Sequence, residues 1–245
     1  ITGAGGLLGS EFVGSIINAG ATCYAVDIDN KKLKRLKKKF VDIDQSNRLH
    51  LLNFDISNTK QVTYFYNRLK KKNIFVDVII NNAAFNPAPS PKKIDNWDND
   101  IKISLTSVKN IIEKFSLDMI KNKKGNIINI GSDLSIIAPD QKLYSHIKNY
   151  IKPLSYSVTK HGIVGLTKYY ASLFGKYNIR CNCLCPGGVK NKQDKNFIKK
   201  ISRLIPIGRM ANKDEYNGII VFLCSDASKF ITGQNIIADG GRSIL

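Results

Sequence analysis

Two tyrosine–lysine pairs with the same spacing lie close together in the second half of the chain. The stretch LYSHIKNYIKPLSYSVTK, residues 143–160, contains Tyr-x-x-x-Lys as Tyr144 with Lys148 and again as Tyr156 with Lys160. Residues four apart share one face of a helix, so either pair could hold an ammonium group beside a phenol. A nearby positive charge favours the phenolate, and we expect it to lower a tyrosine pKa enough for proton exchange with an alcohol.

The residues that follow each pair distinguish the two. After Lys160, apolar residues recur at helical spacing as far as Phe174, whereas Pro153 follows Lys148 within five residues and blocks a helix. The sequence therefore predicts that Tyr156 and Lys160 share a helix. The first pair, Tyr144 and Lys148, is interpreted as a chance repeat in an irregular segment.

A second candidate site lies at the start of the chain. The run TGAGGLLG, residues 2–9, is a Gly-rich turn that precedes a helical pattern, where backbone N–H groups and the helix dipole can hold a pyrophosphate. Asp27 ends the next strand-like run, where a carboxylate can accept hydrogen bonds from both hydroxyls of an adenosine ribose. This carboxylate would repel a 2′-phosphate, and residue 28 is Ile, so NAD is favoured over NADP; Lys31 and Lys32 keep NADP open.

Strand-like and helical segments alternate along the whole chain. The predicted strands are short and rich in Ile and Val, and they cover residues 21–28, 48–56, 75–83, 125–132, 179–187 and 234–241. Helical patterns cover 11–20, 31–40, 57–69, 97–120 and 156–174. This alternation predicts an α/β fold of the Rossmann-like, doubly wound kind, with a parallel sheet covered by helices on both faces in a single domain over residues 1–245. Because the chain opens inside the Gly-rich motif, we expect a first strand before Ile1.

Two segments do not fit this alternation. Residues 86–95 are rich in proline, and residues 133–155 contain Pro139 and Pro153 between a strand and a helix. Long irregular segments in compact domains are often functional.

The composition restricts the class of protein. The net charge is +19, but no nucleic-acid motif accompanies it, and the lysines are distributed along the chain, so we expect no nucleic-acid partner. The sequence contains no apolar run of roughly eighteen residues or more, so we expect no membrane span.

Cys181, Cys183 and Cys185 alternate on a predicted strand and are interpreted as small buried hydrophobic residues, with no metal site. The odd number of cysteines and the lack of a secretory signal favour a reduced, cytoplasmic protein.

Taken in order, these motifs resemble the short-chain dehydrogenase/reductase family. The resemblance rests on the Gly-rich turn, Asp27, NNAA (81–84), Ser132, the YSVTK run (156–160) and PGG (186–188), and it continues to ADGG (238–241). It implies a nicotinamide cofactor and hydride transfer at an alcohol carbon, with Ser132, Tyr156 and Lys160 as the catalytic residues. The positive charge of an oxidised nicotinamide would then add to that of Lys160 in lowering the pKa of Tyr156. The cofactor-binding residues that it implies, together with those given above, are Gly3, Gly5, Gly6, Leu8, Gly9, Asp27, Asp55, Ile56, Asn81, Ala83, Ala84, Tyr156, Lys160, Pro186, Gly187 and Val189.

The chain departs from the family pattern at three places. Leu7 stands where the turn usually has its second glycine, and Ser104 stands where the family usually has an asparagine that kinks a helix and holds a water. The segment between Ser132 and Tyr156 is longer than is typical and is polar, which suits a hydroxylated or phosphorylated substrate. These features resemble the sugar-modifying subgroup associated with flagellin and surface-glycan modification.

The leading hypothesis is therefore an NAD-dependent oxidoreductase for a polar, sugar-derived small molecule. Two alternatives are an NADPH-dependent 3-oxoacyl-type ketone reductase and a non-catalytic dinucleotide-binding sensor. The resemblance also implies a homodimer or homotetramer, formed through the helices after the fourth and fifth strands and through the C-terminal strand.

Overall fold

The computed structural model describes residues 1–40, 47–85 and 97–245 of the chain. Its strands are β1 (Cys23–Asp27), β2 (Leu49–Asn53), β3 (Val78–Asn81), β4 (Gly125–Ile130), β5 (Ile179–Pro186) and β6 (Asn235–Ala238). All the strand pairs are parallel, in the ladders β1–β2 and β3–β4–β5–β6. Each strand falls inside a predicted range. Strands β3, β4 and β5 are buried along almost their whole length, as expected of apolar runs in a sheet covered on both faces.

The first residues of the chain lie between the two ladders. The backbone N–H of Thr2 donates to the Ile80 carbonyl over 3.0 Å, and that of Ala4 donates to the Val26 carbonyl over 3.0 Å. Residues 1–4 therefore connect β1 to β3 and place the Gly-rich turn at the carboxyl ends of both strands. In open α/β sheets this edge is where ligands bind.

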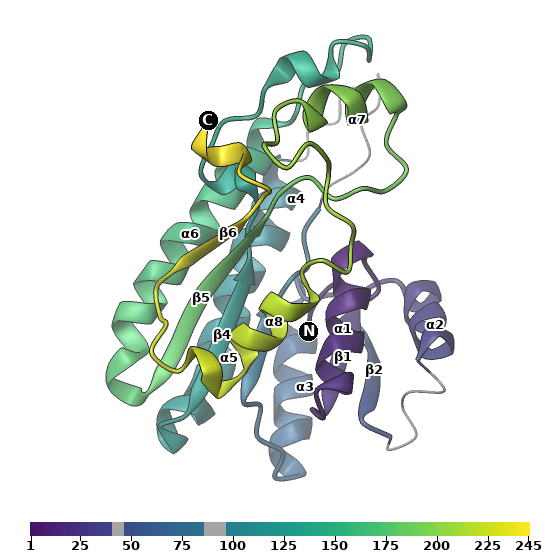
Figure 1. Ribbon diagram of the computed structural model, residues 1–245. Coiled ribbons are helices and arrows are strands. Elements are labelled where there is room, and N and C mark those ends of the chain that lie inside the picture. The colour runs from purple at the N-terminus through teal and green to yellow at the C-terminus, as the bar shows by residue number, and fades with distance from the viewer. Residues whose placement is uncertain (41–46, 86–96) are drawn as a thin grey trace.

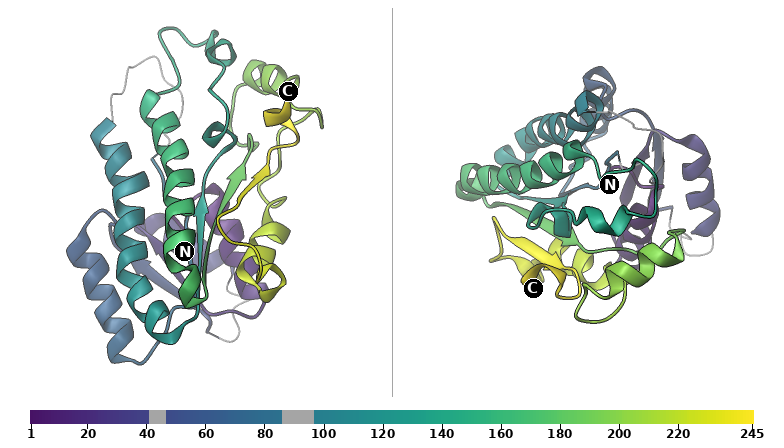
Figure 2. Two further views of the ribbon diagram at one scale, coloured as in Figure 1. Left: turned by 90° about the vertical axis from the view of Figure 1, so that its left-hand side faces the viewer. Right: turned by 90° about the horizontal axis from the view of Figure 1, so that it is seen from above.

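Helices cover both faces of the sheet (Figures 1 and 2). The helices are α1 (Leu7–Asn18), α2 (Asn30–Lys39), α3 (Thr59–Lys71), α4 (Trp97–Ile101), α5 (Ser107–Asn122), α6 (Leu154–Phe174), α7 (Lys195–Ser202) and α8 (Asn217–Cys224). Side chains of α3, α5 and α6 pack on one face with Ile127, while Phe12 of α1 and Leu223 of α8 pack on the other with Ile128. The Rossmann-like, doubly wound α/β fold is confirmed.

The helical pattern over 97–120 is not one uniform helix. A π-helical segment, Lys102–Thr106, separates α4 from α5, and the Ser107 hydroxyl donates to the Lys102 carbonyl over 2.7 Å. Ser104 is buried in this segment. The irregular turn that the resemblance ascribes to an asparagine is thus present here with a serine; π-turns inside helices often mark functional sites.

The segment between β4 and α6 is irregular, as predicted, apart from two 3₁₀ turns at Asp133–Ser135 and Gln141–Tyr144. Pro153 caps the N-terminus of α6, which explains why the helix includes Tyr156 and excludes Tyr144. Tyr144 is buried against Tyr150 and against Phe197 of α7, so it has a packing role. Figure 1 places this segment beside α7, at one end of the molecule. The Pro-rich stretch 86–95 lies outside the described residues.

Two further expectations concern the buried cysteines and the membrane. Cys181, Cys183 and Cys185 are fully buried in β5 and pack in the core on the α3, α5 and α6 side, as expected for small hydrophobic residues. Within the described ranges, no helix has both the length and the apolar character that crossing a membrane requires.

Candidate active site

Strand β4 and helix α6 bring Ser132, Tyr156 and Lys160 together. Ser132 follows the carboxyl end of β4, and Tyr156 and Lys160 are one turn apart near the start of α6. The Tyr156 phenol forms a hydrogen bond with the Ser132 side chain, and Lys160 Nζ donates to the carbonyl of Ile130, the last residue of β4, over 2.8 Å. We call this group the Tyr156 site; all three residues were singled out from the sequence.

Burial dominates the electrostatics of Tyr156 in the protein without a bound cofactor. Burial raises the pKa of Tyr156 to about 12, the hydrogen bond with Ser132 lowers it, and the charge of Asp133 raises it. Without a bound cofactor burial dominates, and the Lys160 ammonium is 5.8 Å from the ring centroid and bonded to Ile130. A lowering of the Tyr156 pKa by Lys160 together with an oxidised nicotinamide stays a prediction for the cofactor complex. Burial also lowers the pKa of Lys160.

A buried carboxylate extends the Tyr156 site toward the C-terminus of the chain. The Ser132 hydroxyl donates to Asp133 Oδ1 over 2.7 Å, and Arg242 Nη1 donates to Asp133 Oδ2 over 2.5 Å. Asp133 and Arg242 are both almost fully buried. The sequence did not reveal this ion pair, since the two residues are 109 positions apart.

A second lysine lies against the same tyrosine. Lys152 Nζ is 3.8 Å from the centroid of the Tyr156 ring, and the Lys152 side chain is half-buried. Burial and the charge of Lys160 lower the pKa of Lys152 to about 8, although Asp133 and Asp100 oppose this effect. Lys152 was not singled out from the sequence, because nothing in the irregular segment indicates where its side chain lies.

The Gly-rich turn has the shape that a dinucleotide requires. Gly3 has a φ of +61°, and a Cβ added to Gly9 would lie 2.2 Å from the Gly3 carbonyl oxygen, so neither position tolerates a side chain. Helix α1 begins after Gly6 with no side-chain cap and no acidic residue in its first turn. Its first N–H groups can therefore bind an anion, and Leu7 does not disrupt the turn.

Asp27 lies beside this turn. Its carboxylate accepts hydrogen bonds from the backbone N–H groups of Gly5 and Asp29, each over 2.9 Å. The side chain is buried, whereas Ile28 is 68% exposed. These residues fit the predicted adenosine end of a dinucleotide, with a negative charge fixed in place by two N–H groups.

The other predicted cofactor residues differ in whether their side chains are already bonded or buried elsewhere in the protein. Ala83 and Ala84 lie at the carboxyl end of β3, Leu8 at the start of α1, and Pro186, Gly187 and Val189 at or just after the carboxyl end of β5. Asn81 instead donates its amide to Asn129 Oδ1 over 2.8 Å, and the Ile56 side chain is buried in the core, so a contact with a cofactor would come from their backbones. Asp55 accepts from the N–H and hydroxyl of Ser57.

Sequence reasoning missed the role of Asn82. Its amide donates to the carbonyls of Thr2 and Gly3, each over 3.0 Å, so Asn82 holds the Gly-rich turn against β3. The only indication of this role in the sequence was the second Asn of NNAA, which directly follows the predicted cofactor residue Asn81.

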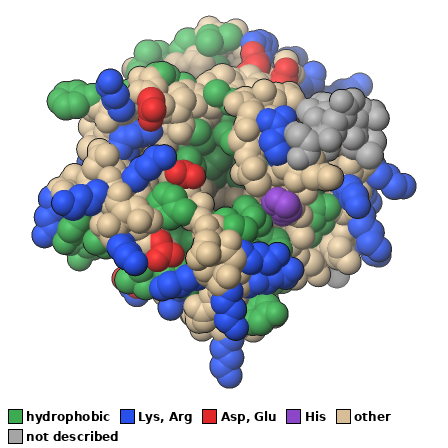
Figure 3. All heavy atoms as spheres, turned by 90° about the horizontal axis from the view of Figure 1, so that it is seen from below, with side chains coloured by type: hydrophobic (Ala, Val, Ile, Leu, Met, Phe, Trp, Pro, Cys, Tyr) green, Lys and Arg blue, Asp and Glu red, His purple; other side chains and the backbone are tan. Residues whose placement is uncertain are grey.

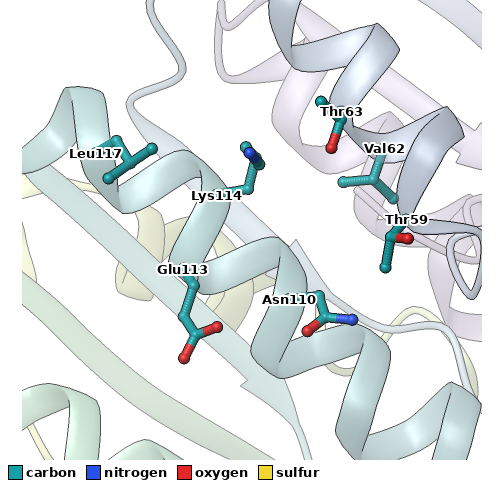
Figure 4. Close-up of a pocket in the computed structure, with 7 residues that line it drawn as sticks. All are labelled: Thr59, Val62, Thr63, Asn110, Glu113, Lys114 and Leu117. Atoms are coloured by element: carbon teal, nitrogen blue, oxygen red, sulfur yellow. The ribbon is translucent and has the colours of Figure 1, made fainter.

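A surface pocket of about 340 Å³ lies elsewhere, between α3 and α5 (Figure 4). Its lining comprises Thr59, Val62, Thr63, Asn110, Glu113, Lys114 and Leu117, and it includes no residue of the Tyr156 site. Among the residues that the structure describes, no three His, Cys, Asp or Glu side chains are grouped as metal ligands.

Comparison with known proteins agrees with this geometry. A family model described as Enoyl-(Acyl carrier protein) reductase matches residues 6–243. The chain is 30% identical to 3-oxoacyl-[acyl-carrier-protein] reductase FabG of Thermotoga maritima, with 100% of this chain and 96% of the relative covered.

Solved structures share the fold. A short-chain dehydrogenase of Leptospira borgpetersenii with bound NAD+ has 30% sequence identity and a TM-score of 0.84, over 99% of this chain and 91% of that one. A gluconate 5-dehydrogenase of Burkholderia cenocepacia in complex with NADP and tartrate has 26% identity and a TM-score of 0.86, over 100% and 94%. The chain thus belongs to the short-chain dehydrogenase/reductase family and is an oxidoreductase that acts on CH–OH groups.

Proposed function

We propose that this protein is an NAD-dependent oxidoreductase that transfers a hydride between nicotinamide and a secondary alcohol or ketone of a polar, sugar-derived substrate. The observation that carries this proposal is the contact of the Tyr156 phenol with Ser132, beside a buried Lys160. The Gly-rich turn and Asp27 support binding of the dinucleotide at the same edge of the sheet.

Each residue of the Tyr156 site has a distinct role in this proposal. When bound, the nicotinamide supplies the hydride chemistry. Tyr156 takes the hydroxyl proton when an alcohol is oxidised and returns it when a ketone is reduced. Ser132, whose hydroxyl donates to Asp133 in the absence of substrate, turns that hydroxyl to the reacting oxygen when substrate binds and orients it. Lys160 holds the nicotinamide ribose and adds positive charge near the phenol.

The proposed preference for NAD comes from Asp27. A buried carboxylate that is held by two backbone N–H groups cannot turn away from a 2′-phosphate, so the repulsion persists. The two structural relatives were solved with different cofactors, NAD+ in one and NADP in the other, and family membership alone does not choose between them.

The polar substrate follows from the side chains around Tyr156. Asp133, Arg242 and Lys152 offer charged groups there, whereas a long acyl chain would need an apolar surface. The relative with 26% identity is named a gluconate 5-dehydrogenase, which is consistent with a sugar-derived substrate. The FabG relative favours the alternative, a 3-oxoacyl-type reductase that uses NADPH.

A panel assay tests the proposal. Formation of NADH from NAD, and of NADPH from NADP, would be followed with sugars, sugar acids, sugar phosphates and hydroxyacyl thioesters. The proposal predicts turnover of a hydroxylated substrate with NAD. Turnover confined to hydroxyacyl thioesters with NADP would support the acyl reductase instead.

A further inference from the structure

A buried ion pair lies beside the Ser132 hydroxyl. The side chains of Asp133 and Arg242 are 5% and 7% exposed, and Arg242 Nη1 donates to Asp133 Oδ2 over 2.5 Å. Charges that are buried to this extent are screened little by water and salt, so each acts on the groups around it. The Tyr156 site therefore contains a pair of opposite charges that has no part in the proton transfer proposed above.

The C-terminal turn of the chain holds Arg242 in place. The Asp239 carboxylate accepts hydrogen bonds from the backbone N–H groups of Gly241 and Ser243, over 2.9 and 2.7 Å, on either side of Arg242 in the chain. Gly241 has a φ of +89°, a conformation that favours glycine. Arg242 is thus presented by a turn whose backbone is fixed.

The two oxygens of Asp133 have different partners. Oδ2 accepts from Arg242, whereas Oδ1 accepts from the Leu134 N–H over 2.8 Å and from the Ser132 hydroxyl over 2.7 Å. The carboxylate therefore keeps two donors when the Ser132 hydroxyl turns away. A serine hydroxyl has one proton, and here that proton lies in the bond to Asp133. The Tyr156 phenol must then supply the proton of its own bond with Ser132.

This arrangement has to change when Tyr156 acts as a base. A phenolate needs a hydrogen-bond donor, and in the proposed function the Ser132 hydroxyl also turns to the reacting oxygen, so in both cases it leaves Asp133. A carboxylate opposes this turn, because hydrogen bonds to charged acceptors are about twice as strong as neutral ones. The charge of Asp133 also raises the pKa of Tyr156, since it repels a phenolate.

We propose that Asp133 and Arg242 are positioning residues of the Tyr156 site, which compete with the phenolate and the reacting oxygen for the Ser132 hydroxyl and so limit how readily Tyr156 gives up its proton. Arg242 provides the opposite charge that a buried carboxylate requires, and the Ser132 hydroxyl transmits the effect to the phenol. This inference deepens the proposed function and rests on it for its consequence in catalysis.

Other titratable groups also face Tyr156 or Asp133, from several elements. They are Tyr144 of the 3₁₀ turn 141–144, Lys152 before α6, Lys160 of α6, and Tyr216 at the start of α8. All four are unchanged in the variants below. A difference in titration between the variants and the wild type therefore reports on the ion pair.

Titration of Tyr156 in the complex with oxidised NAD tests the inference without any substrate. Tyrosine labelled with carbon-13 at Cζ reports the ionisation of each phenol by NMR, and the Tyr156 signal is the one that Tyr156→Phe removes. The first neutral variant combines Asp133→Asn with Arg242→Gln and keeps much of the shape of both side chains. The second combines Asp133→Leu with Arg242→Met, because apolar replacement of a buried ion pair is often neutral or stabilising and so protects the fold.

Removing the pair is expected to lower the pH at which Tyr156 titrates by about one unit or more, because a like charge is lost and the Ser132 hydroxyl is free to donate to the phenolate. The matched control combines Arg209→Gln with Glu215→Gln, which removes an exposed ion pair and should titrate as the wild type does. An unchanged or raised midpoint in both neutral variants overturns the inference, and so does an equal shift in the control.

Substitution of Ser132 separates competition for its hydroxyl from repulsion by the charge alone. With Ser132→Ala in the wild type and in the neutral variants, no hydroxyl remains to be released, so the shift should shrink to about half or less. A shift of full size would show that Asp133 acts through its charge alone, and the proposed competition would be overturned. A purely structural role of the pair produces no such dependence on Ser132.

The inference and the proposed function can fail separately. If the titration shifts as expected but no substrate of the panel is oxidised or reduced, the positioning role stands and the proposed function fails. If a hydroxylated substrate is turned over with NAD but the titration midpoint does not move, the function stands and the inference fails. If both hold, the rise of kcat/KM for oxidation should move to lower pH in the neutral variants.

Discussion

Burial and hydrogen bonding act on Tyr156 in opposite directions. Burial raises its pKa to about 12, while the bond with Ser132 lowers it. In the protein by itself the phenol is therefore protonated at neutral pH, ready to donate a proton to a ketone. To act as a base, it needs the additional positive charge of an oxidised nicotinamide.

A pH profile follows from this state of Tyr156. For reduction of a neutral ketone the phenol must be protonated, so kcat/KM should stay flat between about pH 6 and pH 9, well below its pKa. For oxidation of a neutral alcohol the phenolate is required, so kcat/KM should rise by up to about tenfold per pH unit over the same range. Steady-state kinetics in both directions would check this, and an oxidation rate that falls with pH would contradict it.

The charge of Asp27 should set the cofactor preference. Asp27→Asn keeps the size of the side chain but removes the repulsion toward a 2′-phosphate, so the ratio of Kd for NADPH to Kd for NADH should fall about tenfold or more. Fluorescence titration with NADH and NADPH measures this ratio. The matched control is Asp29→Asn, which removes a charge two residues away at the cap of α2 and should leave the ratio nearly unchanged.

At the residue scale, the sequence predicted those site residues that occur in motifs with a fixed spacing. Ser132, Tyr156 and Lys160 were predicted and lie together. Lys152 and the partnership of Asp133 with Arg242 were not predicted, because they depend on the path of an irregular segment and on a contact across 109 positions. The effect of burial on the pKa of Tyr156 was not predicted, because burial cannot be read from a spacing.

The elements around the Tyr156 site are joined by a buried polar network. Asn81 of β3 donates to Asn129 of β4, and Asn129 donates to the Thr167 hydroxyl of α6 over 3.0 Å. Asn129 and Thr167 are fully buried. The network thus connects β3 and β4 to the helix that carries Tyr156 and Lys160. If one of its side chains is replaced by an apolar one, a buried amide is left without a hydrogen-bond partner.

Removing one member should be costly. Thr167→Val keeps the shape but leaves the Asn129 amide short of a partner, which should lower the free energy of unfolding by about 1–3 kcal/mol. Urea denaturation measures this change. Thr159→Val is the control, because Thr159 is buried on the same helix but its hydroxyl donates to the Tyr156 carbonyl of that helix. Equal losses from the two variants would argue against the network.

At the element scale, the periodicity of apolar residues and the positions of proline and glycine predicted most of the strands and helices. All six strands and the helix that begins after Pro153 were placed correctly, because Ile-rich runs and a helix-blocking proline act locally. The π-helical segment at 102–106 and the helices α7 and α8 were not predicted. They depend on packing against α6, on the segment 133–155 and on the sheet, none of which is visible in local periodicity.

At the scale of the whole molecule, positive charge is in excess and is concentrated on the exposed face of α2, whose sequence is NKKLKRLKKK. On the face shown in Figure 3, Lys and Arg side chains are separated by uncharged and hydrophobic ones and form no continuous stripe. With a net charge of +19, the surface as a whole attracts anions. A long-range field of this sign would raise the local concentration of an anionic substrate.

We expect the protein to form a dimer or tetramer. Leu117 of α5 and Tyr169 and Leu173 of α6 are 55%, 63% and 43% exposed, which is a substantial apolar area on neighbouring helices. Sedimentation velocity should show a dimer or larger assembly that Leu117→Lys with Leu173→Lys shifts toward monomer. Tyr64→Lys, on an exposed part of α3, is the control. Wild-type protein that sediments only as a monomer would contradict this expectation.

The assignment of proton transfer to Tyr156, rather than to the equally spaced Tyr144, is tested most directly by comparing Tyr156→Phe with Tyr144→Phe. We would measure kcat on the best substrate of the panel, together with the Kd of NADH. The account predicts that Tyr156→Phe lowers kcat by about 10²- to 10⁴-fold with NADH affinity nearly unchanged, whereas Tyr144→Phe retains turnover. Turnover that survives in Tyr156→Phe, or is lost only in Tyr144→Phe, would contradict it.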